Sequence, residues 1–572
     1  MTASGWIFVV GINAAIILVG LWKARDTRES VSWFLAARGL PWWMVGLSMF
    51  ATAVDSGDYV AVAGAAWDRG MPYISTWWVG MTVGWMVMTW VVLEPMYRSG
   101  MFTNCEYLEY RFGPTARTIA VFIQLQTRTN VLGNVAFSLY LTFDMLTGWG
   151  VQTWWLVVAI AVFAAAYTAM GGLKSVAVTD SLQSVVMLVA AILLWWTVWD
   201  HVGGWSGIET RLNEHTATGE ITPELAHAMT HAGGTSEPET PSWMMVIGFM
   251  LVMTSYCVIN QSQAMRMLAS RSKWDLRMAA AAAAAVTAFV LWFNVTLGIM
   301  GRALFPDLDT GDRVFPLLVE QFLIPMGGVL TAVVVAGLLA GGISTYDSIG
   351  SAMASLFTRD IYARFMVRRA GDRHYVQVSR LVTFAVIALS FFYIPFLGHG
   401  MVALYLRLVG VAVIPLLTVY LLGVLTPVSR SSGTVGLIVG ILLGLTKFAD
   451  PVVIDLYGVP LPHWWTGTFQ GYLWSAGLTS AAMIITSLLH GWARREDVGA
   501  MMFRSGSEMS FRKSKGTESG TNWLESSREQ VLTVSDYPFE LSPDGLKWFQ
   551  RTGLWSTLVV GTVLLFNFVI FW

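Results

Sequence analysis

Long apolar segments recur along the whole chain, and each is bounded by polar or basic residues. A run of about 18 or more apolar residues is long enough to cross a bilayer as a helix. On this criterion the sequence predicts about fourteen membrane-spanning helices, and therefore an all-α polytopic membrane protein. The predicted spans are residues 5–22, 41–67, 73–95, 115–146, 150–171, 177–200, 242–269, 276–304, 320–357, 378–398, 402–427, 433–448, 467–492 and 553–572.

The composition indicates the same class of protein. Of the 572 residues, 55% are hydrophobic and only 12% are charged, which is too little charge to cover a soluble protein of this size. The formal net charge of −1 gives no reason to expect a nucleic acid as partner. The sequence contains no nucleotide-binding loop, nucleophile–base pair or metal triad, so we do not expect an enzyme.

Basic residues alternate between the two sides of the predicted spans, as the positive-inside rule requires. Residues 201–241 are poor in Lys and Arg and are assigned to the extracytoplasmic side. Both termini are then expected outside the cytoplasm, in a multi-pass protein of the plasma (inner) membrane. The basic residues assigned to the cytoplasmic side include Lys23, Arg98, Arg117, Lys174, Arg266, Arg271 and the run at 359–380.

Two polar segments lie between the spans. In the extracytoplasmic segment 201–241, His227 and His231 are spaced to share one helix face. A zinc site needs three or four ligands in fixed geometry, so a solvated segment is favoured over a metal site. The second segment, 493–551, is rich in Ser and Arg and is interpreted as a cytoplasmic linker.

Two carboxylates interrupt the second apolar segment. The stretch "FATAVDSGDYV" places Asp55 and Asp58 on either side of Ser56 and Gly57. A broken helix exposes backbone carbonyls, and irregular backbone is tolerated at membrane depth only where it lines a cavity. We therefore expect at least one of the two acids to bind a ligand. The alternatives are a place at the outer mouth or an ion pair with an arginine of another helix.

Hydroxyl and carboxylate oxygens also gather in the ninth span. Its stretch "GGISTYDSIGS" contains Ser344, Thr345, Asp347 and Ser348. Oxygen ligands of this kind suit a monovalent cation that must also leave. The alternative is that the hydroxyls only bond back to carbonyls of their own helix. Asp180, near the start of the sixth span, is either a site residue or an acid at the interface.

Three further polar positions lie inside apolar segments. Asn260 belongs to "VINQSQ", which predicts a second broken helix, and two broken helices in corresponding halves indicate a central transport site. Arg128 and Arg407 each lie within an apolar segment. Either arginine could pair with an aspartate or hold the carboxylate of a solute.

Four stretches in order resemble the sodium/solute symporter family, whose members include the sodium/glucose, proline and sialic acid symporters. The resemblance implies a LeuT-type fold, with two inverted repeats of five helices within residues 31–430. It also implies an extra N-terminal helix in 1–30, accessory helices in 431–492 and a C-terminal helix in 552–572. The stretches are "FATAVDSGDYV", "FTNCEYLEYRFGPTAR", "YTAMGGLKSVAVTDSLQ" and "STYDSIGSAMASLFTRDIY".

The resemblance also implies roles for individual residues. A second sodium site seen in part of the family would combine Asp180 with the positions of Ser344, Asp347 and Ser348, although Asp347 replaces a hydroxyl there. Tyr256 lies where the sugar symporters keep a gating tyrosine, and Arg128 lies on the span that carries a carboxylate-binding arginine in the sialic acid symporters. The principal sodium site would use the carbonyls of Ala51, Val54 and Gly341 and the hydroxyls of Ser344 and Thr345.

These features predict a sodium-coupled symporter that imports a small polar solute by alternating access. Ala53, Asp58 and Arg407 replace the polar sugar contacts, so a hexose is disfavoured and a charged or zwitterionic solute is expected. The expected substrate residues are Asp55, Asp58, Arg128, Tyr256, Asn260 and Arg407. Sodium is the expected coupling ion, the solute and the lipid bilayer are the expected partners, and no organic cofactor or obligate protein partner is expected. The alternatives are proton coupling through Asp55, Asp58 or Asp347, and a transporter-like sensor or channel.

Overall fold

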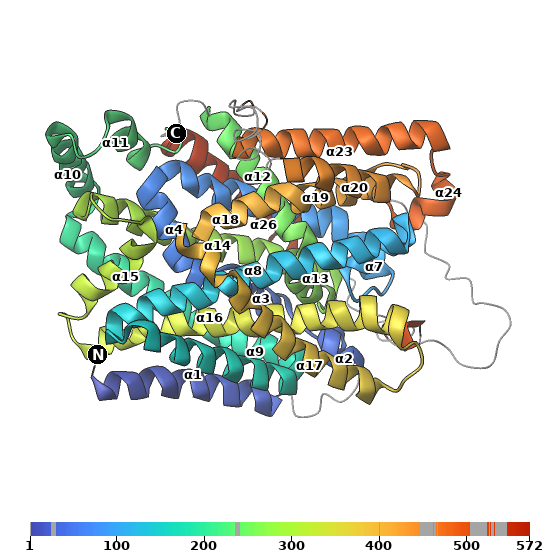
Figure 1. Cartoon of the computed structure of the whole chain (residues 1–572), viewed down its shortest axis with the longest axis horizontal. Helices are drawn as coiled ribbons and strands as arrows, with labels where there is room; N and C mark the ends of the chain where they lie inside the picture. The colour runs from blue at the N-terminus through green and yellow to red at the C-terminus, as the bar shows by residue number, and fades with distance from the viewer. Residues whose placement is uncertain are drawn as a thin grey trace.

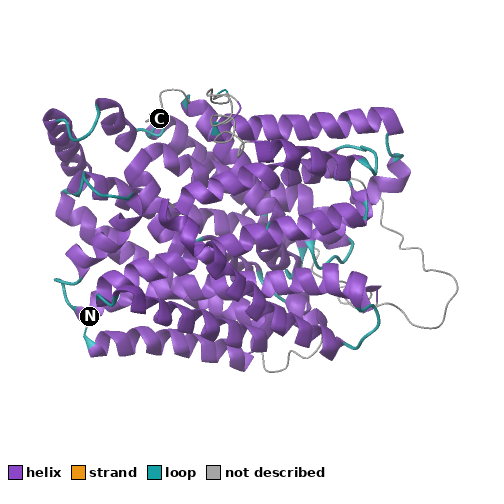
Figure 2. Ribbon diagram, viewed as in Figure 1, coloured by secondary structure: helices purple, strands orange, loops and turns teal. Residues whose placement is uncertain are grey.

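The computed structural model is helical throughout its described regular structure, as Figure 2 shows. It describes residues 2–23, 30–234, 241–399, 401–446, 467–503 and 546–572, together with isolated positions between 462 and 531. Within this part of the chain no strand is present, and a single β-bridge joins Leu40 to Ser270. Most of the predicted linker at 493–551 lies outside the described residues.

The first half of the chain contributes the following helices. They are α1 (Ala3–Lys23), α2 (Ser30–Leu35), α3 (Trp42–Ala53), α4 (Ser56–Arg69), α5 (Thr82–Val87), α6 (Leu93–Arg98), α7 (Asn104–Phe112), α8 (Pro114–Thr147), α9 (Thr153–Val202), α10 (Gly204–Thr218) and α11 (Pro223–Thr230).

The second half contributes a second series. It consists of α12 (Ser242–Ile259), α13 (Gln261–Leu268), α14 (Lys273–Leu304), α15 (Val314–Leu318), α16 (Gly328–Leu356), α17 (Asp372–Ser390), α18 (Met401–Leu408), α19 (Ile414–Leu425), α20 (Ser432–Leu445), α23 (Thr468–His490), α24 (Arg495–Val498) and α26 (Thr552–Leu565). In Figure 1, α1, α16 and α23 run roughly parallel along the long axis of the molecule.

Nine helical segments of the described residues are long and apolar enough to cross a membrane. Shorter apolar helices, among them Trp42–Ala53, Val409–Leu425 and Ser432–Leu445, accompany them. The chain is therefore a multi-pass membrane protein, while the number of fourteen spans stays a prediction. The ninth predicted span begins later than expected, because α16 starts at Gly328 and not near residue 320.

The predicted fifth and sixth spans are joined by a sharp turn inside α9. A straight helix of 50 residues would extend about 75 Å, more than twice the thickness of the hydrocarbon core. At Gly172 the backbone leaves the helical region (φ 62°, ψ −173°). A Cβ atom there would lie 2.9 Å from the Trp33 ring, so both the backbone angle and the packing require glycine.

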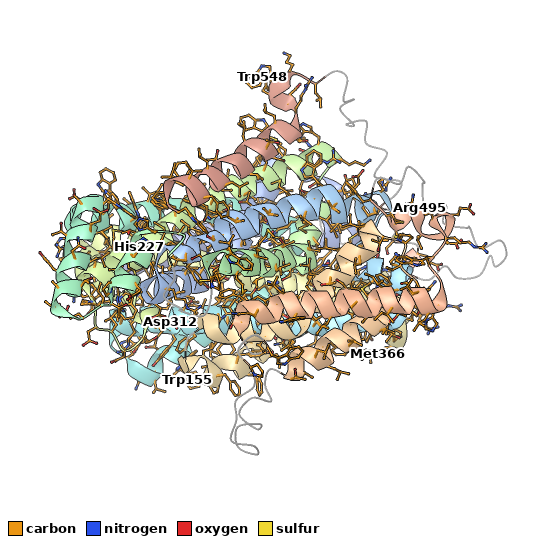
Figure 3. The ribbon with its side chains drawn as sticks, turned by 90° about the horizontal axis from the view of Figure 1, so that it is seen from above. Trp155, His227, Asp312, Met366, Arg495 and Trp548 are labelled. Carbon is orange, nitrogen blue, oxygen red and sulfur yellow. The ribbon has the colours of Figure 1, made fainter. Side chains whose placement is uncertain are left out.

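The two termini lie at the same end of the molecule as the 201–234 segment. The Ala232 amide donates to the Phe571 carbonyl, which joins this segment to the C-terminal helix. Figure 1 shows the N-terminus, α10 and α11 toward one end and α24 at the other, and Figure 3 shows His227 and Arg495 at opposite ends. The described part of the predicted loop at 201–241 thus contains two helices, while the extracytoplasmic placement of both termini stays a prediction.

Candidate functional site

The second span is broken where the sequence places its two carboxylates. α3 ends at Ala53, Val54 and Asp55 are extended, and α4 begins at Ser56. The Asp58 amide donates to Asp55 Oδ1 (3.0 Å), and the Asp55 amide donates to Asp58 Oδ2 (3.1 Å). This reciprocal pair is a capping box, which satisfies backbone donors at the start of α4. The two acids therefore stabilise the interruption between α3 and α4 by capping the start of α4.

A second broken helix lies in the other half of the chain. α12 ends at Ile259, and Asn260 caps α13 by accepting a hydrogen bond from the Ser262 amide (3.0 Å). The Gln263 side chain donates to the Met49 carbonyl on α3 (3.2 Å). The two interrupted helices are thus in direct contact, as expected for a transport site between two repeats.

α16 passes directly beside the first break. A Cβ atom on Gly341 would lie only 3.4 Å from the backbone of Asp55, so the missing side chain allows this close approach. Ser344 Oγ lies 3.1 Å from the Ala51 carbonyl oxygen and 2.6 Å from Asp180 Oδ1. The predicted ligands on α16 and at the break are therefore neighbours.

The hydroxyl of Thr345 points into the same region. Thr345 Oγ1 is buried, and no described atom forms a hydrogen bond with it. It lies beside the Asp55 carboxyl group. A buried oxygen without a partner is unusual in a folded protein and needs an explanation, such as a ligand that the site receives.

A buried arginine, Arg266, lies among the polar side chains of Ser48, Asp180 and Ser348. The sequence places Arg266 among the basic residues of the cytoplasmic side, but its side chain is fully buried. Arg266 Nη2 donates to Asp180 Oδ2 (2.8 Å) and to Ser348 Oγ. Its Nε donates to Ser48 Oγ (2.6 Å). The sequence signal that could have indicated this ion pair is an arginine close to a broken helix together with an acid, Asp180, on another apolar span.

Asp347 lies on the other side of this cluster. The Tyr167 hydroxyl donates to Asp347 Oδ2, and Ser348 Oγ donates to Oδ1 (3.1 Å). Asp180, Asp347 and Ser348 are all fully buried. The structure therefore brings the three predicted residues of the second sodium site together, with the Arg266 guanidinium bonded to two of them.

A cavity of about 80 Å³ borders the first break. Both acids of the break line it, and four aromatic side chains form much of its wall. Trp77 lines the cavity, whereas Trp78 stacks on Trp292 (5.5 Å between ring centroids). The lining residues are Ala53, Asp55, Gly57, Asp58, Ala61, Val62, Tyr73, Trp77, Val131, Asn134, Met253, Tyr256, Tyr405 and Leu406.

The other predicted substrate residues differ in their position. The Arg128 guanidinium stacks on the Tyr256 ring (4.6 Å to the centroid) and forms no ion pair within the described part of the chain. The Tyr256 hydroxyl donates to the Thr52 carbonyl (3.3 Å). Asn260 caps α13 and does not line the cavity. The backbone of Arg407 belongs to α18, but its side chain lies outside the described residues.

Charged side chains also connect α7, α8 and the helical extension of α16. Arg117 on α8 donates to Glu109 on α7 (2.5 Å) and to Asp360 in the extension of α16. Arg364 donates to Glu109 (2.7 Å). Arg117 and Asp360 are almost completely buried, and this network was not predicted from the sequence.

The described residues contain no group of three or more His, Cys, Asp or Glu side chains that could hold a metal ion through these ligands. His227 and His231 stack on one another (4.1 Å between centroids). The preference for a solvated segment over a zinc site at 201–241 stays a prediction. A sodium site made of hydroxyl and carbonyl oxygens is a different kind of site.

Comparisons with known proteins assign the family. Residues 33–444 match the Sodium:solute symporter family. Sodium/myo-inositol cotransporter 2 of Mus musculus is 28% identical over 475 residues, which cover 76% of this chain and 68% of that protein. Sodium/glucose cotransporter 2 of Rattus norvegicus is 26% identical over 479 residues, which cover 76% and 69% of the respective chains.

A solved structure supports the fold. The substrate-bound outward-open state of a Na⁺-coupled sialic acid symporter superposes with a TM-score of 0.70 at 22% identity, and the match covers 86% of this chain and 98% of the other. The predicted LeuT-type helical fold is thereby confirmed. Since the family match also spans most of the sequence, the chain belongs to the sodium:solute symporter family.

Proposed function

We propose that this protein imports a small polar organic solute, charged or zwitterionic, by coupling its movement to sodium through alternating access. The observation that carries the proposal is the meeting of α16 with the first helix break. Ser344 approaches the Ala51 carbonyl there, and the buried Thr345 hydroxyl, beside the Asp55 carboxyl group, has no hydrogen-bond partner of good geometry among the described residues.

The proposed principal sodium site consists of three carbonyls and two hydroxyls. Ala51 and Val54 flank the end of α3, Gly341 contacts the break, and Ser344 and Thr345 complete the set. These are hard oxygen ligands, and Asp55 and Asp180 nearby supply negative charge without filling the site. Sodium bound there would join α3 to α16 and favour the state that accepts solute.

The second sodium site, at Asp180, Asp347 and Ser348, stays a prediction. In this arrangement the Arg266 guanidinium already supplies a positive charge between Asp180 and Ser348. A sodium ion could join them only beside Arg266 or after it had moved. The cluster contains two carboxyl groups and one guanidinium group, so with both acids ionised it has a net negative charge that favours a cation nearby.

The cavity is the proposed solute site. Asp55, Asp58 and Tyr256 line it, and the Arg128 guanidinium stacks on the Tyr256 ring. Charges of both signs near one cavity suit a charged or zwitterionic solute better than a hexose. Arg407 is kept as a proposed contact from the sequence, and Asn260 is proposed to act by shaping the second break.

Proton coupling is the second candidate, and one observation favours it. Asp347 is fully buried and is bonded to the hydroxyls of Tyr167 and Ser348, not to a cation. Such a carboxyl group can take up and release a proton as its surroundings change. Uptake driven by a pH gradient in the absence of sodium would support this candidate over the first.

The test is uptake into proteoliposomes that contain the purified full chain. A panel of radiolabelled amino acids, betaines, carboxylates and hexoses is supplied with an inward sodium gradient or an equal potassium gradient. We expect at least one solute to accumulate only with sodium, and accumulation to fall sharply in Ser344→Ala and Thr345→Ala. Ser351→Ala is the matched control, because Ser351 Oγ bonds only to a carbonyl of its own helix among the described residues. Accumulation indifferent to sodium and to both substitutions would refute the proposal.

A further inference from the structure

The cavity contains an acid, Asp58, whose charge no described side chain of its wall balances. Asp58 Oδ2 accepts a hydrogen bond from the Asp55 amide, and Asp55 Oδ1 accepts one from the Asp58 amide. Neither carboxylate forms an ion pair with any described residue. Two uncompensated acids next to one cavity at membrane depth are costly unless a ligand brings positive charge.

The two acids face different partners. Asp55 is almost completely buried and lies beside Thr345 and Gly341, on the side of the proposed sodium site. Asp58 is partly exposed and faces the cavity. The N-terminus of α4 adds a partial positive charge to both. One sodium ion would balance Asp55, which leaves the charge of Asp58 to be balanced from the cavity.

The rest of the wall suits an organic cation. Tyr73, Trp77, Tyr256 and Tyr405 line the cavity, from three different parts of the chain. The faces of aromatic rings attract cations, and a group of such rings around an acid is the usual way in which proteins bind ammonium groups. No described Lys, Arg or His side chain lines the cavity.

One further acceptor faces the same space. Asn134 lines the cavity, and its Oδ1 atom is buried without a hydrogen-bond partner among the described residues. The remaining lining residues are apolar or glycine. A hexose presents several hydroxyls that need both donors and acceptors, and a free carboxylate would meet Asp58. The wall supplies acceptors and ring faces, which fit a cationic group.

We propose that the transported solute carries an ammonium group, which binds between the Asp58 carboxylate and the aromatic wall. This inference rests on the proposed function, in that it takes the cavity to be the solute site. It narrows the class of solute from any charged or zwitterionic compound to compounds with a positively charged group that binds at Asp58. Arg128, which stacks on Tyr256, is not proposed to contact the ammonium group. Its positive charge can favour an anionic group at the other end of the solute.

The experiment compares ligands of one shape and different charge. Intrinsic tryptophan fluorescence of the purified full chain is recorded in saturating sodium during titration with choline, glycine betaine, myo-inositol and the neutral analogue of choline. In that analogue a tert-butyl group replaces the trimethylammonium group. We expect saturable binding of choline or glycine betaine, and binding at least about tenfold weaker for the neutral analogue and for myo-inositol.

Two variants locate the binding. Asp58→Asn keeps an oxygen that can accept from the Asp55 amide, and we expect it to weaken ammonium binding at least about tenfold. Asp68→Asn is the matched control, because Asp68 is exposed on the same helix and does not line the cavity. We expect it to bind ammonium compounds as the unchanged protein does.

The outcomes separate this inference from the proposed function. Equal binding of choline and its neutral analogue, equal binding in Asp58→Asn and the unchanged protein, or no ammonium binding would overturn the inference. The proposed function is tested separately by the fluorescence change on adding sodium instead of potassium without any organic ligand. If sodium changes the fluorescence but choline and its neutral analogue bind equally, only the inference of an ammonium group is refuted. If choline binds more tightly than its neutral analogue but sodium has no effect, only sodium coupling is refuted.

Discussion

At the scale of single residues, Asp55 and Asp58 serve the backbone and the cavity together. The sequence predicts a broken helix from two acids and a glycine in an apolar segment, and the structure has that break at Val54–Asp55. The capping box between the acids could also be read from their spacing, because each reaches the amide of the other. The absence of a cationic partner among the described side chains could not be predicted from the sequence, because it depends on which side chains the other helices place nearby.

Arg266 shows why some site residues escape prediction. The positive-inside rule assigns it to the cytoplasmic side by position alone. The structure instead buries it against Asp180, which is 86 residues away in the chain. Long-range pairs of this kind depend on how α9, α13 and α16 pack, and no local pattern contains that information.

We predict that Arg266→Gln destabilises the protein by about 3–5 kcal/mol, because it leaves Asp180 buried without its counter-charge. The measurement is thermal unfolding in detergent, monitored by circular dichroism. Arg266→Met combined with Asp180→Leu removes both charges and is expected to recover most of that loss. A double variant as unstable as the single one would contradict the assigned ion pair.

Asp312, in the short helical turn before α15, provides a prediction about pH. Burial raises the pKa of Asp312 to about 6, partly opposed by a hydrogen bond from the Met401 amide, while the charge of Asp68 raises it further. The folded state therefore binds a proton more tightly than the unfolded state. The free energy of unfolding should fall as the pH rises from about 4 to about 6, by an amount on the order of 2 kcal/mol.

The measurement is the melting temperature as a function of pH for two matched variants. Asp312→Asn keeps an oxygen for the Met401 amide and is expected to lose this part of the pH dependence. Asp309→Asn is the control, because the Asp309 side chain is 88% exposed and pairs with Arg313 on the surface. Identical pH profiles for Asp312→Asn and the unchanged protein would show that another group titrates.

At the scale of elements, the two broken helices and the turn in α9 determine where the site lies. The sequence predicts both breaks and separates the fifth and sixth spans, because glycine and polar residues interrupt apolar runs there. It does not predict the helices α10 and α11, since a polar amphipathic pattern is also typical of a solvated loop. Nor does it predict the late start of α16, because the preceding apolar residues continue the same pattern.

We predict that Gly172→Ala destabilises the protein more than Gly148→Ala. Both glycines have positive φ angles, 62° and 67°. At Gly148 the backbone is left-handed helical, which costs another residue about 1–2 kcal/mol, whereas Gly172, with ψ −173°, lies in a region that essentially only glycine adopts. Only at Gly172 would the new Cβ also meet a side chain, the Trp33 ring at 2.9 Å, which adds about 1–3 kcal/mol. Thermal unfolding of the two variants side by side is the measurement, and equal losses would contradict the tight turn.

At the scale of the whole molecule, the proposed alternating access would require one buried charge network to open. Arg117, Glu109, Asp360 and Arg364 join α7 and α8 to the extension of α16. Glu109 is partly buried, yet its hydrogen bonds with Arg364 and the charge of Arg117 lower its pKa. In the proposed mechanism these ion pairs hold this end closed, and the cost of breaking them is part of the barrier to opening it.

We predict that Arg117→Gln exposes the buried Cys105 on α7, because it releases the closed end. The measurement is the rate of alkylation of Cys105 by a hydrophilic maleimide, followed by mass spectrometry, and we expect an increase of about tenfold or more. Arg313→Gln is the control, because it removes an exposed ion pair, Arg313 with Asp309, that does not belong to this network. Unchanged alkylation of Cys105 in Arg117→Gln would mean that this network does not close the pathway.

The central claim is that sodium binds where α16 meets the break between α3 and α4. The most direct measurement is equilibrium binding of radiolabelled sodium to the purified full chain, with Thr345→Ala and Ser351→Ala beside it. We predict saturable binding that unlabelled sodium displaces and potassium does not, abolished in Thr345→Ala and retained in Ser351→Ala. Binding of equal strength in Thr345→Ala, or no saturable binding to the unchanged protein, would contradict the claim.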